Sequence, residues 1–187
     1  MNTVEAVKSL EEITTIETSL KKKKGAIYAD IWKFGLNVGL RIQDLLSIEY
    51  DQIDAKKHTY TLKEGKTRKS RTITLNNTAL EIVNRRREDN PDDKYLFQSH
   101  SPKLKRGVQQ PISRVSVSRA FKKIGDDLGL KINTHSMRKS RGYAMHKHGV
   151  PIEKISKVLN HSHPAVTMRY IGLEDEEIQK SYYDFEL

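Results

Sequence analysis

A histidine and an arginine stand three residues apart in the segment THSMR, at His135 and Arg138. Residues at this spacing point to the same side of a helix, so both could bind one phosphate. An isolated pair of this kind is more often two incidental basic residues on a solvated helix start. Three further segments favour the phosphate site over incidental basic residues. They are GLRIQDLL with Arg41, LNHS with His161, and MRYIG with Tyr170 nine residues beyond His161.

These residue types suit the chemistry of a phosphodiester. Attack on phosphorus builds negative charge on the nonbridging oxygens, and the planar, permanently charged guanidinium of arginine binds such oxygens in pairs. The chain contains no cysteine, so covalent catalysis needs another nucleophile. A tyrosine hydroxyl has an ordinary pKa of about 10 and therefore needs a base and a cationic pocket.

The four segments, in this order, resemble the tyrosine recombinase (phage integrase) family. The segments HSMRK, LNHS and RYIG are further similar to those of small stand-alone phage-type integrases, which consist of little more than the catalytic domain. The resemblance covers about Ala26 to Gly172. It implies an α+β, mostly α-helical catalytic domain with a small antiparallel β-sheet or hairpin. Residue by residue, it implies these catalytic positions: Arg41, Lys66, His135, Arg138, His161 and Tyr170.

The resemblance also implies their roles. Arg41 and Arg138 would bind the phosphate together with His161, His135 would take the proton of Tyr170, and a hairpin lysine would protonate the leaving 5′ oxygen. Lys66 in GKTRKSRTITL fits that lysine, with Lys69 as the alternative. Two positions depart from the family pattern: Asn160 replaces a glycine, and Lys139 replaces a histidine.

The function that follows is site-specific DNA recombination through a 3′-phosphotyrosyl intermediate. The phosphotyrosyl link conserves the energy of the broken bond, so no ATP is needed, and no metal or other cofactor is expected. A type IB topoisomerase is the nearest enzymatic alternative, because it uses a similar pocket without paired sites. A DNA-binding accessory protein that has lost catalysis is the alternative from another class.

The elements that must position these residues are mainly helices. Apolar spacing predicts a helix or lead-in over residues 1–20, a buried helix from Ala26 to Val38 ended by Gly39, and a short helix near Arg41. Strand composition at His58 to Leu62 and Arg71 to Leu75 predicts a hairpin. Further helices are predicted from Thr78 to Arg87, Ser116 to Leu128, His135 to about His148 with Thr134 as cap, Pro151 to about Asn160, and from Pro164 through Tyr170.

Charge predicts the partners. The formal net charge is +10, but residues 171–187 hold six acidic residues and one lysine, a balance of −5, which leaves +15 on residues 1–170. A basic body favours double-stranded DNA. The acidic tail, residues 171–187, carries apolar residues that would pack either on its own domain or on a neighbouring copy in a tetramer on paired sites.

The chain has two short basic runs, Lys21 to Lys24 and Arg85 to Arg87. Each run would either contact DNA or be a solvated helix face. We expect one catalytic domain over residues 1–187, since no repeat or linker divides the chain. No segment is apolar and long enough to span a membrane, and a cytoplasmic location is expected.

Overall fold

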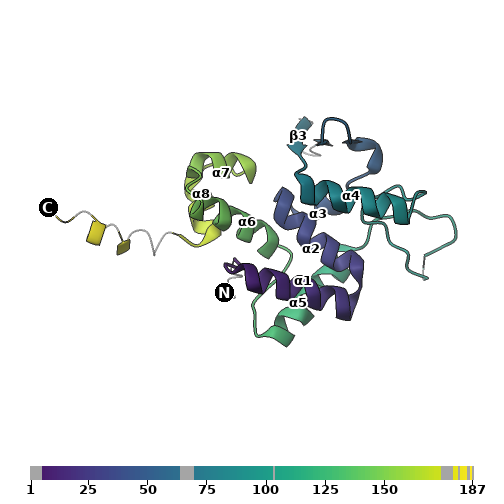
Figure 1. Ribbon diagram of the computed structural model, residues 1–187, viewed down its shortest axis with the longest axis horizontal. Coiled ribbons are helices and arrows are strands. Elements are labelled where there is room, and N and C mark those ends of the chain that lie inside the picture. The colour runs from purple at the N-terminus through teal and green to yellow at the C-terminus, as the bar shows by residue number, and fades with distance from the viewer. Residues whose placement is uncertain are drawn as a thin grey trace.

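The computed structural model describes residues 6–63, 70–102, 104–173, 179–180, 182–184 and 186. Most of them are helical, and one three-stranded antiparallel sheet lies beside the helices (Figure 1). This confirms the predicted α+β, mostly helical class. Within these ranges, no helix is both long and apolar enough to cross a membrane.

Eight α-helices, one 3-10 helix and three strands are assigned to the described residues. In chain order they are α1 (Leu10–Lys24), α2 (Ala26–Val38), α3 (Ile42–Leu46), η1 (Tyr50–Gln52), β1 (Ile53–Asp54), β2 (Thr59–Lys63), β3 (Ser70–Thr74), α4 (Asn77–Asp89), α5 (Arg114–Leu128), α6 (Ser136–Lys147), α7 (Ile152–Val158) and α8 (Pro164–Ile171).

Helix ends differ from the predicted ones where a different side chain caps the first turn. The first helix begins only at Leu10, because Ser9 caps it by accepting from the Glu12 N–H, and it runs on to Lys24. The predicted cap at Thr78 is wrong, since Asn76 accepts from the Ala79 N–H. Ser113 caps α5, which therefore begins at Arg114, two residues before the predicted start at Ser116. His135, and not Thr134, stands at the N-cap of α6.

The sheet has the order β1-β2-β3, and the predicted hairpin is its β2–β3 pair. Thr59 pairs with Thr74 and Lys63 with Ser70, so the strands run side by side up to the hairpin tip. Strand β1 was not predicted, because a two-residue strand carries no alternating pattern. The tip, residues 64–69, lies outside the described residues.

Helix α2 is the central element, in contact with α1, α4 and α6. It inserts Trp32 edge-on against Phe121, with ring centroids 5.4 Å apart, and Phe34 against Phe97 at 5.6 Å. Gly35 lets α6 approach closely, since a Cβ there would lie 2.3 Å from the Met137 sulfur. Helix α6 is therefore packed directly on the end of α2.

Buried apolar residues form two clusters. The main cluster joins α1 to α5, the sheet and Met137 of α6. The second cluster contains Tyr143, Ile155, Leu159, Ile171 and Leu173, from α6, α7, α8 and the residue after Gly172. Figure 1 shows α7 and α8 beyond α6, away from α4 and the sheet. Helix α6 contributes to both clusters and so connects them.

The run Arg85 to Arg87 has a role that neither sequence interpretation included. Arg85 and Arg86 both form ion pairs with the buried Asp30 of α2. Arg86 is itself 7% exposed and also donates to the Leu96 carbonyl. These arginines hold α4 on α2, whereas Lys21 to Lys24 are all exposed side chains.

Candidate active site

Arg41 and Arg138 meet at the end of α2. Gly39 ends that helix with φ +66°, a left-handed conformation that favours glycine, and so turns the chain toward Arg41. From α6, Arg138 Nη1 donates to the Gly39 carbonyl at 2.6 Å. The last carbonyls of a helix lack intrahelical partners and attract cations, so this is a favourable place for a guanidinium.

Arg138 is the most deeply buried of the proposed catalytic residues that the structure describes. Its side chain is 3% exposed, and its Nη2 is buried without a hydrogen-bond partner among the described residues. Burial lowers the pKa of Arg138 to about 10; Tyr170 opposes this shift, and the charges of Arg41 and Arg71 add to it. A buried guanidinium N–H without an acceptor is costly, so this group is well suited to bind an anion.

Tyr170 lies against these cations. Its helix, α8, starts with Pro164 at the first position, as predicted, and ends at Ile171 with Gly172 as the C-cap. The Tyr170 hydroxyl donates to the His135 carbonyl at 3.5 Å, and the Arg138 Cζ lies 5.9 Å from the ring centroid. Burial raises the pKa of Tyr170, while Arg138 and Arg41 work in the opposite direction.

His161 lies beside Tyr170, in the loop between α7 and α8. The two rings meet edge-on with centroids 4.9 Å apart. His161 Nδ1 is 2.9 Å from the hydroxyl oxygen of Thr167, which is fully buried. Burial, followed by the charges of Arg138 and Arg41, lowers the pKa of His161 to about 4. The ring is therefore neutral near pH 7 in the protein without DNA.

His135 stands at the edge of the same group. Its backbone N–H donates to Asn133 Oδ1 at 2.7 Å, which holds the start of α6. Loss of hydration lowers the pKa of His135, and the charges of Arg114, Arg138, Lys139 and Arg41 lower it further. A neutral imidazole can accept a proton.

Arg41 connects the main cluster to the His161 loop. Its side chain is exposed, and its Nη2 donates to the Asn160 carbonyl at 3.4 Å. The structure thus brings five of the six predicted residues together: Arg41, His135, Arg138, His161 and Tyr170.

Comparison with known proteins shows the family of the chain. Residues 6–177 match the sequence model of the phage integrase family. Over 186 residues the chain is 31% identical to the probable integrase/recombinase YoeC of Bacillus subtilis, covering 99% of this chain and 98% of YoeC.

The chain belongs to the phage integrase family of tyrosine recombinases.

Longer relatives share this part. The tyrosine recombinase XerA of Pyrococcus furiosus is 29% identical over 144 residues, 76% of this chain and 49% of XerA. A crystal structure of XerA recombinase superposes with a TM-score of 0.74 at 16% identity, covering 98% of this chain and 65% of that one. A lambda integrase dimer bound to a COC′ core site gives 0.72 at 16% identity, covering 94% and 62%. These likenesses establish the fold, and the chain spans about half to two thirds of these longer proteins.

Asn160, where the integrase family pattern has glycine, adopts φ +48°. This left-handed conformation is one that glycine enters freely and that asparagine tolerates better than most other residues. The departure therefore keeps the backbone turn that places His161. Lys139, the other departure, lies with its Nζ 5.2 Å from the centroid of the Tyr170 ring.

Lys66 and its alternative Lys69 fall within residues 64–69, outside the described residues. Their assignment as proton donor stays a prediction. Among the described residues, no three His, Asp or Glu side chains are grouped so that they could hold a metal ion.

Three residues of the site were not found from the sequence. Thr167 positions His161, and Arg71 donates from β3 to the Lys157 and Val158 carbonyls at the end of α7. Arg71 alternates with Ile73 and Leu75, so an arginine on the apolar face of the strand was the available signal.

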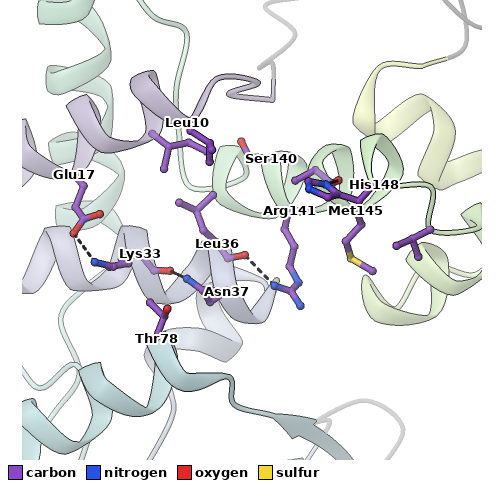
Figure 2. A pocket seen from close by; sticks show the side chains of 13 residues that line it. Leu10, Glu17, Lys33, Leu36, Asn37, Thr78, Ser140, Arg141, Met145 and His148 are labelled. Atoms are coloured by element: carbon purple, nitrogen blue, oxygen red, sulfur yellow. Dashed lines mark hydrogen bonds and ion pairs between the residues drawn. The ribbon is translucent and has the colours of Figure 1, made fainter.

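Arg141 is the third. It lies one helical turn after Arg138 and donates from Nη1 to the Leu36 carbonyl at 3.2 Å, in the pocket between α1, α2 and α6 that Figure 2 shows. Arg138 and Arg141 thus both bind carbonyls in the last turn of α2. This doubled contact fixes α6 relative to Arg41.

Proposed function

We propose that this recombinase cleaves and rejoins DNA at specific sites through a 3′-phosphotyrosyl bond to Tyr170. The observation that carries the proposal is the buried Nη2 of Arg138, which has no protein partner among the described residues and belongs to the guanidinium beside the Tyr170 ring. A bound phosphate would give this N–H a nonbridging oxygen as acceptor and would present its phosphorus to the Tyr170 oxygen.

The two arginines stabilise the charge of the transition state in this proposal. Attack by the Tyr170 oxygen places extra negative charge on the nonbridging oxygens, and donors held in place beforehand stabilise that charge without reorganising. Arg138 is held by the Gly39 carbonyl, and Arg41 lies within the same cationic group. The arginines supply the positive charge, so the proposal needs no metal.

Proton transfer completes the reaction. His135 takes the proton of Tyr170, and its lowered pKa keeps the ring neutral and able to do so. If His161 Nδ1 accepts from the Thr167 hydroxyl, Nε2 carries the proton and can donate to the phosphate. A hairpin lysine, Lys66 or Lys69, protonates the 5′ oxygen as it leaves. Rejoining reverses these steps, and the phosphotyrosyl bond retains the energy needed.

Double-stranded DNA is the proposed partner. The positive charge of residues 1–170 supports it, because basic residues bind the phosphate backbone irrespective of sequence. The cytoplasmic location expected from the sequence stays a prediction.

We also propose that copies associate as a tetramer on paired sites through the acidic tail. Tyr182 and Tyr183 are 74% and 85% exposed and can anchor on another copy. Ile171 and Leu173 are 2% exposed and pack in the second cluster of their own chain. The docking segment therefore starts after Leu173, later than the boundary at residue 171 taken from charge.

Trapping of the covalent intermediate tests the proposed nucleophile. A DNA substrate nicked near the cut, so that the 5′ fragment diffuses away, should leave protein on DNA as a band that survives denaturant. Tyr170→Phe should abolish that band and keep the fold, since only a hydroxyl is removed. Peptide mapping should find the nucleotide on the segment from Met168 to Gly172.

The double variant Tyr182→Phe, Tyr183→Phe is the matched control, because both side chains are exposed tyrosines outside the site and the change keeps the rings that would anchor on another copy. It should form the adduct as the parent does. An adduct that persists in Tyr170→Phe would refute the nucleophile, and no adduct on any DNA would favour the accessory-protein alternative. Relaxation of supercoiled DNA without sequence preference would favour the topoisomerase alternative.

A further inference from the structure

Arg71 joins the sheet to the helix that precedes the His161 loop. Its side chain lies half-buried in β3, and one nitrogen, Nη2, donates to two successive carbonyls of α7, Val158 and, at 3.4 Å, Lys157. These carbonyls lie in the last turn of the helix, where a cation is favoured. The contact connects the main cluster with the α7–α8 region.

The His161 loop has several contacts that do not involve β3. The His161 N–H donates to the Ser156 carbonyl at 3.0 Å, its ring pairs with Thr167, and Arg41 binds the Asn160 carbonyl. The loop would thus keep its position without Arg71.

The outer end of β3 depends more strongly on Arg71. Arg71 itself pairs with Leu62, and the next pair, Lys63 with Ser70, is the last before the hairpin tip. Beyond this pairing with β2, the contact from Arg71 to α7 attaches this end of the strand to the helix that precedes the His161 loop. Loss of that contact would detach the outer end of β3 from α7.

We propose that Arg71 is a positioning residue of the reaction: it fastens strand β3 to α7 and so aims the proton donor of the hairpin at the leaving 5′ oxygen. This inference rests on the proposed function. It assigns to Arg71 a role in the departure of the 5′ oxygen, distinct from the roles of Arg41 and Arg138 at the nonbridging oxygens.

A change of leaving group separates these roles. In cleavage, a bond forms between phosphorus and the Tyr170 oxygen, the bond from phosphorus to the 5′ oxygen breaks, and that oxygen receives a proton. In a substrate with sulfur in place of this bridging oxygen, the thiolate leaves without a proton. Removing a residue that acts through the proton donor should therefore slow cleavage of the oxygen substrate and spare the sulfur substrate.

The experiment measures single-turnover cleavage of both substrates at saturating DNA by the full chain and its Arg71→Met variant. We expect Arg71→Met to slow cleavage of the oxygen substrate by about 100-fold, the lower end of what general acid catalysis contributes. It should cleave the sulfur substrate as fast as the parent does. Lys56→Met is the control for loss of a cation from the sheet region, since Lys56 is exposed in the turn between β1 and β2; its rates should equal the parent's.

Arg71→Lys keeps the positive charge near Arg138 but has a shorter reach and lacks the guanidinium. We expect it to be slowed on the oxygen substrate as well, with the sulfur substrate again unaffected. Cooperative thermal unfolding shows whether Arg71→Met folds as the parent does. If it does not, Arg71→Lys replaces it in the comparison of the two substrates.

Equal slowing of both substrates by Arg71→Met, with recovery in Arg71→Lys, would overturn the inference and make Arg71 a phosphate ligand. Parental rates on both substrates would also overturn it. Neither result would affect the proposed function, which fails only if the parent forms no adduct or Tyr170→Phe still forms one.

Discussion

The two buried clusters of this recombinase differ in size and in what they contribute to the site. The main cluster contains the large aromatic side chains Trp32, Phe34, Phe97 and Phe121 and carries Arg41 and Arg71. The second cluster has only five buried apolar side chains among the described residues, and its helices carry Tyr170 and flank the His161 loop. Of the proposed phosphate-binding arginines, Arg41 thus stands on the better-packed region and Arg138 on the helix that joins the two, while the proposed nucleophile stands on the smaller one.

This difference suggests how the site works. Local openings of a protein are drawn from regions with few buried contacts. We therefore expect a nucleophile on the smaller cluster to move more readily than the phosphate pocket on the main one. Arg138 belongs to α6, which takes part in both clusters, and so it lies at their junction.

The largest effect is expected from the two arginines, and it should differ between them. Arg41→Ala should lower cleavage by about 100- to 1,000-fold through lost transition-state stabilisation, with DNA affinity and stability nearly unchanged, because its side chain is exposed. Arg138→Ala should lower cleavage at least as much and also destabilise the fold, since it leaves the Gly39 carbonyl without this donor.

Single-turnover cleavage at saturating DNA and denaturant unfolding measure the two effects. Arg138→Lys, which keeps a cation, serves if Arg138→Ala is too unstable. Parental cleavage rates in both variants would show that these arginines do not bind the reacting phosphate.

A cavity in each cluster compares their stability. Leu159 and Leu45 are both fully buried, in the second and the main cluster respectively. Each change to alanine should cost about 2–5 kcal/mol of local stability. Leu159→Ala should speed hydrogen exchange in α7 and α8 and leave the amides of α2 protected. Leu45→Ala should speed exchange throughout the protein.

Hydrogen exchange followed by mass spectrometry resolves these segments. If Leu159→Ala exposed α2 as much as α7 and α8, the two clusters would form one cooperative unit. The proposed independent movement of Tyr170 would then lose its basis.

The smallest effect concerns His161, which reports the contact between the two regions. Its pKa is about 4 because burial and the charges of Arg138 and Arg41 oppose protonation. The unfolded chain binds this proton at about pH 6.5, so the free energy of unfolding should decrease as the pH falls from there toward the folded pKa. His161→Gln should lose less stability than the parent over this interval.

An NMR titration of the ring measures the pKa directly. Binding of DNA should raise it, because a phosphate anion favours the protonated ring. A midpoint at or above the ordinary histidine value in the free protein would mean that α8 and its loop do not rest against the arginines.

Much of the site could be predicted from the sequence because its residues lie in short segments with local patterns. Gly39 before Arg41, Pro164 before the helix of Tyr170, and the spacing of His135 and Arg138 each reflect interactions within one turn of chain. Capping was less predictable, since Ser113 and Asn76 competed with equally suitable neighbours. The run Arg85 to Arg87 could not be interpreted, because Asp30 lies more than fifty residues away in the sequence and its burial depends on packing.

The sequence by itself determined the family, the helical class, the nucleophile candidate and its cationic companions, because these depend on residue type and local spacing. Tertiary structure decided what surrounds each group. The contacts of Arg138 with Gly39, of Thr167 with His161 and of Arg71 with α7 all join residues from different elements. The pKa shifts of Arg138 and His161 arise from burial and nearby charges, which the packing of α7 and α8 on α6, and of α6 on the end of α2, creates.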